Sequence, residues 1–422
     1  MAKSTAAIAT KNKVVISFDL IGRAGLYPEL DGIRAIAILL VLARHATLIR
    51  RDGHAPFWPL GDYDAATLWL NGWAGVDLFF VLSGLLITLQ LDRIFRAREV
   101  SKQSGEGGGL ARLGAYLKRR VMRILPAYYA WLFICVSGVL VFAPISHENL
   151  GFRVAYHLLL LQDYLPADIV VVFWSLGVEE KFYLLAPLLV GALRTRKITI
   201  VLASLLSIAL LCMVIRAGVW MQLTHPLDYP VFFRAMRSPF HASFDGLSIG
   251  MLIGLLVVRK EELVWLQDMR LARGLVVVGT FASIALLTMR VHLDSDIGLI
   301  TGAGLAFGLS LSFGALVLGL VLGRFPIAIS LLGGRFLRLL AKLSYSLYLV
   351  HFVFVNVTDV MLARSFVWYA ETSIGARLPI HFAVYSGVSM LVAIALHVVI
   401  EKPLLPHASA DLRRPNQARG DS

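Results

Sequence analysis

Two residues with a regular spacing, Arg34 and His45, are the most suited to chemistry in this sequence. Both lie in one apolar run, and ionisable groups inside apolar membrane helices are costly and usually functional. Their separation of 11 positions is about 20° more than three helical turns, so the side chains share one helix face about 16 Å apart. A guanidinium near the membrane edge and an imidazole near mid-membrane would suit a long anionic cofactor. Simple packing of His45 against neighbouring helices is the alternative.

A second pair of arginines, Arg120 and Arg123, is spaced i, i+3 and presents two guanidiniums on one side of a helix. Guanidinium groups fit phosphate oxygens in a bidentate fashion. Ordinary basic residues flanking a membrane helix are the alternative interpretation.

These residues require membrane-spanning helices to position them. Hydrophobic residues make up 58% of the 422 residues and charged residues only 16%, whereas soluble domains have about 45–50% and about 25%. The apolar runs are too long and too even for barrel strands. We therefore predict an all-α fold, a polytopic transmembrane helical bundle of about ten spans. The expected spans are 33–50, 72–91, 124–143, 171–193, 198–218, 242–258, 274–290, 297–322, 343–362 and 381–400. Short apolar segments at 152–161 and 326–333 leave the count between ten and twelve.

The distribution of basic residues predicts the orientation of the bundle. With both termini in the cytoplasm, the inner segments hold 28 Lys and Arg, the outer segments hold 8, and four lie within spans. This asymmetry follows the positive-inside rule and explains the net charge of +13 without nucleic acid. We expect a cytoplasmic segment at 1–32, a membrane domain at 33–403 and a cytoplasmic, disordered tail at 404–422. Two cysteines inside apolar spans, Cys135 and Cys212, indicate neither a disulfide nor a metal site.

Several stretches together resemble the acyltransferase-3 family of bacterial polytopic membrane O-acyltransferases. They are the Arg34-X10-His45 run at 30–45, Gly-Val-Asp-Leu-Phe-Phe at 75–80, Arg-X-X-Arg at 120–123, Trp-Ser-Leu-Gly-Val-Glu-Glu at 174–180, 244–250, Ser-Tyr-Ser-Leu-Tyr at 344–348 and Glu-Lys-Pro at 401–403. The resemblance covers nearly the whole chain in order. It implies acyl-CoA handling by Arg34, Arg120, Arg123 and Tyr345, and it suggests the stand-alone form without an appended esterase-like domain.

Two histidines are candidate bases under this resemblance. A neutral His45 could take the proton of an acceptor hydroxyl that attacks a thioester, or it could form a transient acyl-imidazole. The sequence does not separate these routes. His351, in a later span, is a second candidate base or a hydrogen-bonded structural residue, and we favour the structural interpretation.

Polar residues near the outer face are further candidates. Asp77 lies among apolar residues, where an ionised carboxylate is costly unless paired; it could orient His45, bind the acceptor or pair with a nearby arginine. Ser83 and Gly84 we assign to close helix packing.

The run Glu179-Glu180-Lys181 brings two carboxylates into a span. They point about 100° apart on a helix, so they cannot share one task. We favour Glu180 for positioning the acceptor or supporting His45, and we expect the other to pair with Lys181. Trp174 and Tyr183 we expect in an interfacial aromatic belt.

The sequence therefore predicts a bacterial cytoplasmic-membrane enzyme that moves an acyl group, most simply acetyl, from acyl-CoA to a hydroxyl of a glycan. Expected partners are a carbohydrate or lipid-linked glycan acceptor and membrane lipid, with no nucleic acid and no metal; a homodimer stays open. A secondary transporter or exporter, acylation of a small antibiotic-like molecule, and a non-catalytic scaffold are the alternatives.

Overall fold

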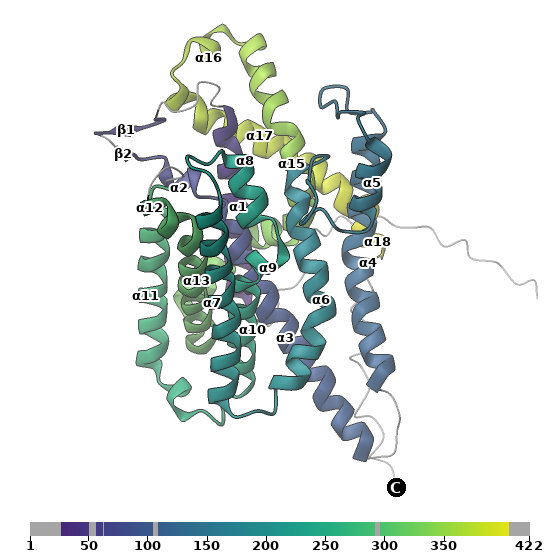
Figure 1. Cartoon of the computed structure of the whole chain (residues 1–422), viewed down its shortest axis with the longest axis vertical. Coiled ribbons are helices and arrows are strands. Elements are labelled where there is room, and N and C mark those ends of the chain that lie inside the picture. The colour runs from purple at the N-terminus through teal and green to yellow at the C-terminus, as the bar shows by residue number, and fades with distance from the viewer. Residues whose placement is uncertain (1–26, 50–55, 62, 104–108, 292–295, 405–422) are drawn as a thin grey trace, which may run out of the picture.

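The computed structural model describes residues 27–49, 56–61, 63–103, 109–291 and 296–404. Most of the expected N-terminal cytoplasmic segment and all but the first residue of the expected tail lie outside these residues. Within the described residues the chain is helical apart from one small hairpin, in which β1 (Pro59–Leu60) pairs antiparallel with β2 (Tyr63–Asp64). The prediction of an all-α bundle is confirmed (Figure 1).

The long helices occupy every position where a span was predicted. They are α1 (Pro28–Ala46), α3 (Ala74–Gln103), α4 (Gly109–Val136), α6 (Trp174–Leu193), α7 (Ile198–Gln222), α10 (Asp245–Val258), α11 (Met269–Leu287), α13 (Leu305–Gly323), α15 (Arg335–Ser365) and α17 (Ile374–Leu396). The shorter helices are α2 (Thr67–Leu70), α5 (Leu150–Leu158), α8 (Tyr229–Phe232), α9 (Phe240–Ser243), α12 (Asp296–Leu299), α14 (Pro326–Leu332), α16 (Val367–Glu371) and α18 (Lys402–Leu404). Single turns of other helix types include η1 (Thr47–Ile49), η2 (Val171–Phe173), η3 (Phe233–Arg237), η4 (Val264–Gln267), η5 (Ile300–Gly304) and η6 (His397–Glu401).

Seven of the described helical segments are long and apolar enough to cross a membrane. They are built on α1, α3, α7, α11, α13, α15 and α17. The other three predicted spans coincide with α4, α6 and α10; α6 carries the charged run 179–181, and α10 has only 14 residues. The number of crossings and the side on which each terminus lies stay predictions.

Helix α1 differs in position from its predicted span. It begins at Pro28, whose ring suits the first helical turn, and it ends at Ala46. His45 therefore lies in the last turn of α1, and not near its middle.

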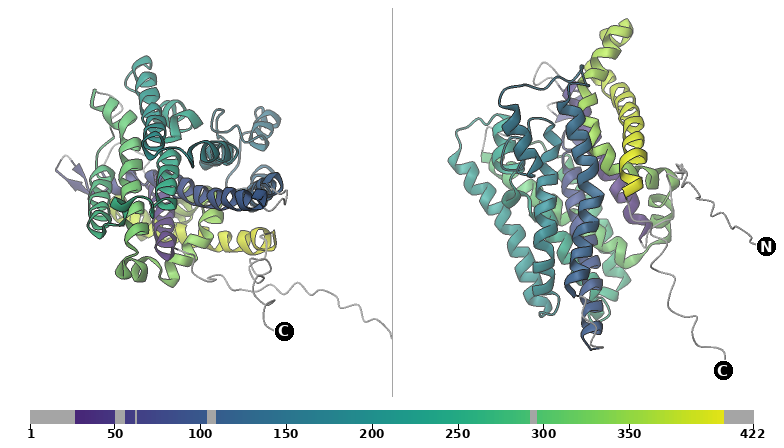
Figure 2. Two further views of the ribbon diagram at one scale, coloured as in Figure 1. Left: turned by 90° about the horizontal axis from the view of Figure 1, so that it is seen from below. Right: turned by 90° about the vertical axis from the view of Figure 1, so that its right-hand side faces the viewer.

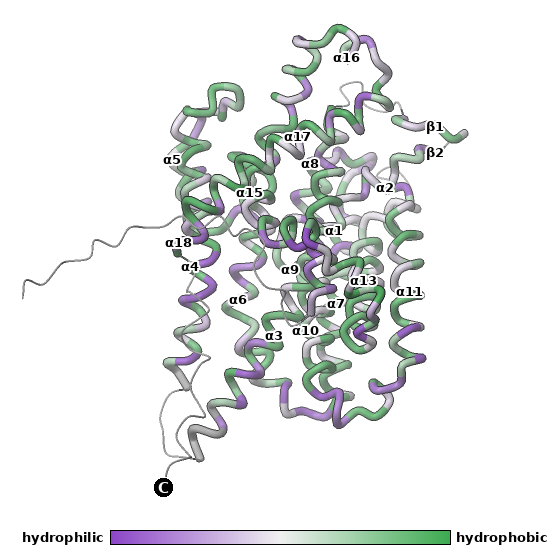
Figure 3. The backbone as a smooth tube through the Cα atoms, turned by 180° about the vertical axis from the view of Figure 1, so that it is seen from behind, coloured by the Kyte–Doolittle hydropathy of each residue, from purple (hydrophilic) through white to green (hydrophobic). Residues whose placement is uncertain are grey.

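Several segments predicted on the same side of the membrane lie at the same end of the bundle. The hairpin, α2, α5 and α16 lie at the upper end of Figure 1, whereas the end of α3 and the start of α4 lie at the lower end. Hydrophilic residues concentrate along that lower end in Figure 3, and the helices above it are mostly hydrophobic. For these segments the arrangement agrees with the alternation predicted from the basic residues, whereas α18, predicted on the inner side, lies about half-way along the bundle in Figure 1.

The centre of the bundle is formed by α10 and its neighbours. Thirteen of the 14 residues of α10 are buried, and α10 packs against α3, α7 and α13. Glycines allow the closest of these contacts: a Cβ at Gly84 would lie 2.3 Å from the carbonyl oxygen of Leu247, and one at Gly250 would lie 2.1 Å from that of Val81. Gly84 thus has the packing role predicted for it.

Helix α1 packs against α3 on one side and α15 on another, and α15 in turn packs against α17 (Figure 2). This placement matters for the site, because α1 brings Arg34 and His45 between helices that are distant in the sequence. Large apolar side chains on the outer surfaces of α4, α6, α7, α11 and α17 are exposed, for example Phe133, Leu188 and Leu391, as expected of surfaces that face lipid.

Candidate active site

His45 forms a direct hydrogen bond with a histidine of another helix. Its Nδ1 lies 3.1 Å from Nε2 of His351 on α15 and 2.9 Å from the carbonyl oxygen of Val41, one turn earlier on α1. Nδ1 of His351 lies 2.8 Å and 3.1 Å from the carbonyl oxygens of Tyr348 and Leu347. The contact of α1 with α15 brings the two imidazoles together.

These contacts fix the neutral tautomers of both rings. A carbonyl oxygen only accepts hydrogen bonds, so Nδ1 of each histidine carries the proton. His351 Nε2 is then an acceptor, and His45 Nδ1 donates both to it and to Val41. Nε2 of His45 consequently bears a lone pair, and it has no hydrogen-bond partner among the described residues. This is the tautomer that a general base requires.

His45 lies in the wall of a cavity of about 880 Å³. The cavity extends from the last turn of α1 toward the end of the bundle that carries the hairpin, and its walls come from α1, α2, the start of α3, residues 163–174, residues 229–238 and α15. Aromatic rings line much of it: Tyr63, Trp73, Tyr164, Trp174, Tyr229, Phe232, Phe233, Tyr348 and Phe352. A cavity of this size and lining suits an organic substrate with flat apolar faces and a few polar groups.

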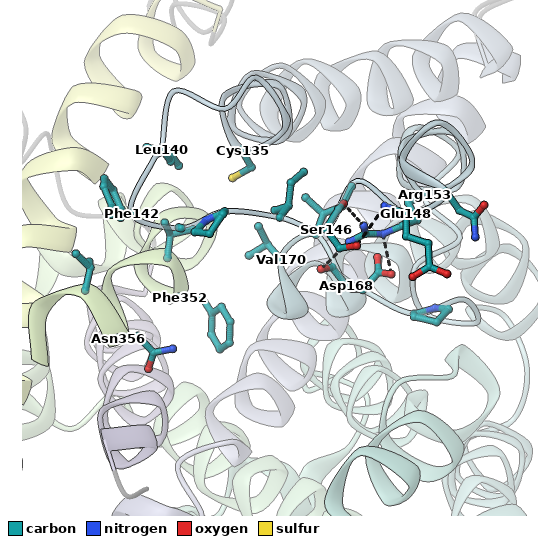
Figure 4. Close-up of a pocket in the computed structure, with 18 of the residues that line it drawn as sticks. Cys135, Leu140, Phe142, Ser146, Glu148, Arg153, Asp168, Val170, Phe352 and Asn356 are labelled. Atoms are coloured by element: carbon teal, nitrogen blue, oxygen red, sulfur yellow. Dashed lines mark hydrogen bonds and ion pairs between the residues drawn. The ribbon is translucent and has the colours of Figure 1, made fainter. Parts of the chain in front are cut away.

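Phe352 lines both this cavity and a second one of about 790 Å³. The edge of its ring meets His45, with the ring centroids 5.2 Å apart. The second cavity, shown in Figure 4, is apolar near Cys135 and Phe352 and polar near Arg153. Arg153 is already paired there with Asp168 at 2.8 Å, so its cation is neutralised. The cavity that contains His45 is the stronger candidate for a reaction site.

Arg34 lies in a separate, charged cluster toward the other end of α1. It is half-buried and interacts electrostatically with Glu179 of α6 and with Arg123 of α4. Glu179 accepts a hydrogen bond from the hydroxyl of Ser83 at 2.6 Å. Ser83 was assigned to helix packing, and its hydroxyl also holds this half-buried carboxylate.

Arg120 belongs to the same cluster. Its guanidinium is hydrogen-bonded to Gln90 of α3 and lies against the rings of Tyr116 and Tyr183, 5.8 Å and 5.6 Å from their centroids. Arg123, one turn further along α4, is exposed. The predicted trio of Arg34, Arg120 and Arg123 thus gathers at one place.

The remaining predicted cofactor residue, Tyr345, lies beside this cluster. Its hydroxyl donates to the carbonyl oxygen of Ile124, the residue after Arg123, at 2.7 Å. Glu180 lies within electrostatic range of Arg120, and its Oε1 is buried with no hydrogen-bond partner in the described part of the chain. Neither Glu179 nor Glu180 lines the cavity of His45, so the structure places both carboxylates with the arginines.

The sequence predicted that Lys181 pairs with a neighbouring glutamate, and this prediction is wrong. Lys181 binds Asp163 at 2.7 Å and the carbonyl oxygen of Leu160 at 2.9 Å. Burial raises the pKa of the Asp163 carboxyl, and the ammonium of Lys181 opposes that shift. The pair ties α6 to the loop that forms one wall of the cavity.

Asp77 pairs with Arg237, a residue that the sequence did not assign to the site. Nη2 of Arg237 lies 3.1 Å and 3.0 Å from the two carboxylate oxygens, and both side chains are buried. The same guanidinium lies 4.6 Å from the ring centroid of Trp73 and 5.9 Å from that of Trp174. Of the roles considered for Asp77, the structure shows pairing with an arginine, and the residue that is hydrogen-bonded to His45 is His351.

Two aromatic residues also differ from their predicted place. Trp174 and Tyr183 are both buried, with 5% and 6% of their surface exposed, and not in an interfacial belt. Trp174 lines the cavity and Tyr183 covers Arg120. Because both residues belong to α6, this helix joins the cavity of His45 to the arginine cluster.

The comparison with protein families agrees with this geometry. A family model described as an acyltransferase domain matches residues 27–398, which include both the arginine cluster and the two histidines. The chain belongs to the acyltransferase-3 family. The resemblance drawn from the motifs is therefore confirmed.

Curated relatives of this acyltransferase-3 chain match over part of their length. It is 28% identical to the O-acetyltransferase OatA of Staphylococcus aureus over 207 residues, 44% of this chain and 29% of that protein. It is 31% identical to the peptidoglycan O-acetyltransferase OatA of Listeria monocytogenes over 174 residues, which are 38% of this chain and 23% of that protein. It is 28% identical to the putative peptidoglycan O-acetyltransferase YrhL of Bacillus subtilis over 206 residues, which are 46% of this chain and 28% of that protein. The matched region spans less than a third of each relative, and no solved structure matches the chain.

In the described residues no group of three or more His, Cys, Asp or Glu could hold a metal ion.

Proposed function

We propose that this chain is a membrane O-acyltransferase that moves an acyl group, acetyl in the simplest case, from cytoplasmic acyl-CoA to a hydroxyl of a cell-envelope or exopolysaccharide glycan. One observation carries the proposal. A histidine with an unprotonated Nε2 lies in a substrate-sized cavity, and the same helix carries an arginine of a cationic cluster.

The cationic cluster is the proposed donor site. Acyl-CoA carries phosphates at one end and a thioester at the end of a long flexible arm. Arg34, Arg120 and Arg123 supply guanidiniums at the predicted cytoplasmic edge, where phosphates bind in a bidentate fashion. Along α1, His45 is about 16 Å from Arg34. The donor would therefore place its phosphates at the cluster and its thioester near the imidazole.

His45 is the proposed general base. Its Nε2 takes the proton of an acceptor hydroxyl while the hydroxyl oxygen bonds to the thioester carbonyl carbon. The carbon–sulfur bond then breaks, and the imidazolium returns the proton to the departing thiolate. His351 stabilises the imidazolium, since its Nε2 accepts a hydrogen bond from the Nδ1 of His45. A covalent acyl-imidazole formed on the same Nε2 is the alternative route.

A glycan acceptor is supported by the cavity lining and by the relatives. Aromatic rings such as Trp73, Trp174 and Tyr348 offer flat surfaces for the apolar faces of sugar rings. The relatives in Listeria monocytogenes and Bacillus subtilis are named for peptidoglycan O-acetylation. Both lines support a carbohydrate better than a small apolar acceptor.

The experiment that tests this function uses the chain reconstituted in lipid vesicles. Radiolabelled acetyl-CoA is supplied on one side, and transfer of label to a panel of envelope glycans is measured, with coenzyme A release followed in parallel. We expect label in a glycan only with acetyl-CoA present. Glycan or solute flux that proceeds without acetyl-CoA, with no label transferred, would contradict the proposal and favour a transporter.

A further inference from the structure

The reaction cavity carries more positive charge than a neutral sugar requires. Four arginines line it: Arg44, Arg234, Arg237 and Arg290. Arginine is scarce on the predicted outer side, which holds only 8 Lys and Arg in all, and three of these eight line this one cavity. The positive-inside rule disfavours such residues there, so their presence calls for a separate reason.

The carboxylates of the cavity do not balance this charge, because they are already engaged. Asp163 pairs with Lys181 at 2.7 Å, and Asp168 pairs with Arg153 at 2.8 Å. Asp64 accepts hydrogen bonds from the backbone N–H groups of residues 57, 58 and 66 at 3.0, 3.1 and 3.0 Å. Of the arginines, Arg237 is the one bound to a carboxylate, that of Asp77.

Arg44 is the most informative of the other three. It precedes His45 in the last turn of α1 and is half-buried. Its guanidinium lies 5.2 Å from the ring centroid of Tyr229 and only 3.4 Å from the hydroxyl of Thr47, a long hydrogen bond. Arg234 is exposed at the same wall. Neither arginine forms an ion pair with any residue that the structure describes.

We propose that this cavity binds an acceptor glycan with a carboxylate close to the hydroxyl that is acylated, and that Arg44 and Arg234 bind the carboxylate. Guanidinium groups recognise carboxylates in a bidentate fashion. A cleft with an excess of positive charge and low-dielectric walls also concentrates anionic ligands. Because Arg44 adjoins His45 in the sequence and in the cavity, an anion held by Arg44 lies beside the base.

This inference rests on the proposed acyl transfer, and it names the class of acceptor. The probes are a hexuronic acid trisaccharide and the same trisaccharide with its carboxyl groups reduced to alcohols. Binding is measured by titration calorimetry on the full chain in vesicles of neutral lipid, without acyl donor. Acetyl transfer to each probe is measured separately.

We expect the acidic trisaccharide to bind more tightly than the reduced one, by about tenfold, since a charge-assisted hydrogen bond is roughly twice as strong as a neutral one. Arg44→Gln should remove most of this preference. Arg234→Gln should reduce it about threefold, because an ion pair between the exposed Arg234 and the ligand carboxylate is weakened by solvent. Both variants should weaken binding of the reduced trisaccharide by a smaller factor than binding of the acidic one. The control is Arg364→Gln, because Arg364 is exposed at the end of α15 and does not line the cavity.

Three outcomes would overturn the inference. The first is equal binding of the two probes. The second is an equal loss of both in Arg44→Gln. The third is a preference that is seen in neutral lipid but disappears when anionic lipid is added at constant ionic strength, which would assign the arginines to lipid phosphates. If the acidic preference is present but no acetyl is transferred to any acceptor, the proposed function fails while the anionic subsite stands. If acetyl is transferred equally to both probes by wild type and variants, the inference alone fails.

Discussion

Nε2 of His351 lies 3.1 Å from Nδ1 of His45 and accepts its proton in a hydrogen bond. The pairing joins α1 to α15 across 306 positions of sequence, and it leaves the opposite nitrogen of His45 free to act as a base. His351 is thus a positioning residue for the proposed reaction, in the place that a carboxylate occupies in many catalytic triads.

His351→Leu and His351→Gln should separate positioning from packing. Leucine fills the space without an acceptor, so we expect kcat to fall about 100-fold, within the range of 10²–10⁴ that general-base catalysis supplies. Glutamine offers a carbonyl oxygen near the position of Nε2, so it should recover much of that loss. The KM for acyl-CoA should be unchanged in both variants. Equal activity of the two variants at equal protein level would mean that His351 only fills space.

Arg34→Gln and Arg120→Gln should weaken donor binding. Each removes one guanidinium from the proposed phosphate site, and a hydrogen bond to a charged group contributes about 1.5–3 kcal/mol. We expect the KM for acyl-CoA to rise about tenfold or more, with a weaker dependence on salt. Arg119→Gln is the control, since Arg119 adjoins Arg120 but is exposed. A rise in KM of the same size in the control would show general charge attraction and no specific site.

Asp77→Asn should act mainly on stability. It leaves the buried guanidinium of Arg237 without its counter-charge, and breaking one side of a buried pair costs about 3–5 kcal/mol. We expect a clear fall in the thermal unfolding midpoint of the chain in detergent. Replacing both residues, as in Asp77→Leu with Arg237→Met, should restore part of the midpoint. If Asp77→Asn keeps the wild-type midpoint but abolishes transfer, Asp77 has a chemical role that its pairing does not explain.

Gly250→Ala should disrupt the packing of α3 on α10. The new Cβ would lie 2.1 Å from the backbone oxygen of Val81, so the helices must separate. Loss of well-packed contact in a core typically costs 1–3 kcal/mol. Gly114→Ala is the matched control, because Gly114 is in α4 with nothing within 4 Å of its Cβ position. The control should be neutral or stabilise by about 0.5–1 kcal/mol, since glycine disfavours helix interiors. The measurement is the thermal unfolding midpoint of each variant in detergent. Equal midpoints in the two variants would contradict the close approach of α3 and α10.

The sequence was sufficient to predict the all-helical bundle and the positions of its long helices, because apolar runs determine where membrane-type helices form. It placed the start of α1 five residues late, since Pro28, Glu29 and Asp31 are not apolar although they form the first helical turn. Hydropathy locates the apolar centre of a helix and not its ends. His45 was therefore predicted near the middle of a span and found in the last turn of α1.

The local geometry of the site was also predictable, whereas its tertiary pairs were not. The shared face of Arg34 and His45 follows from helical periodicity alone. The partners of His45, Asp77 and Lys181 lie on elements distant in sequence, and each of them could have paired with a nearer polar residue. Arg44 and Arg237 gave no signal beyond their charge, because only the packing of α1, α8 and η3 brings them to one cavity.

The central claim is that His45 is the base of an acyl transfer. The most direct measurement is the transfer of radiolabelled acetyl from acetyl-CoA to envelope glycan by vesicles that contain equal amounts of wild type, His45→Ala or His147→Ala, the last an exposed histidine away from the cavity. We predict that transfer is lost in His45→Ala and retained in His147→Ala, with acetyl-CoA binding unchanged in both. Transfer by His45→Ala at the wild-type rate would contradict it.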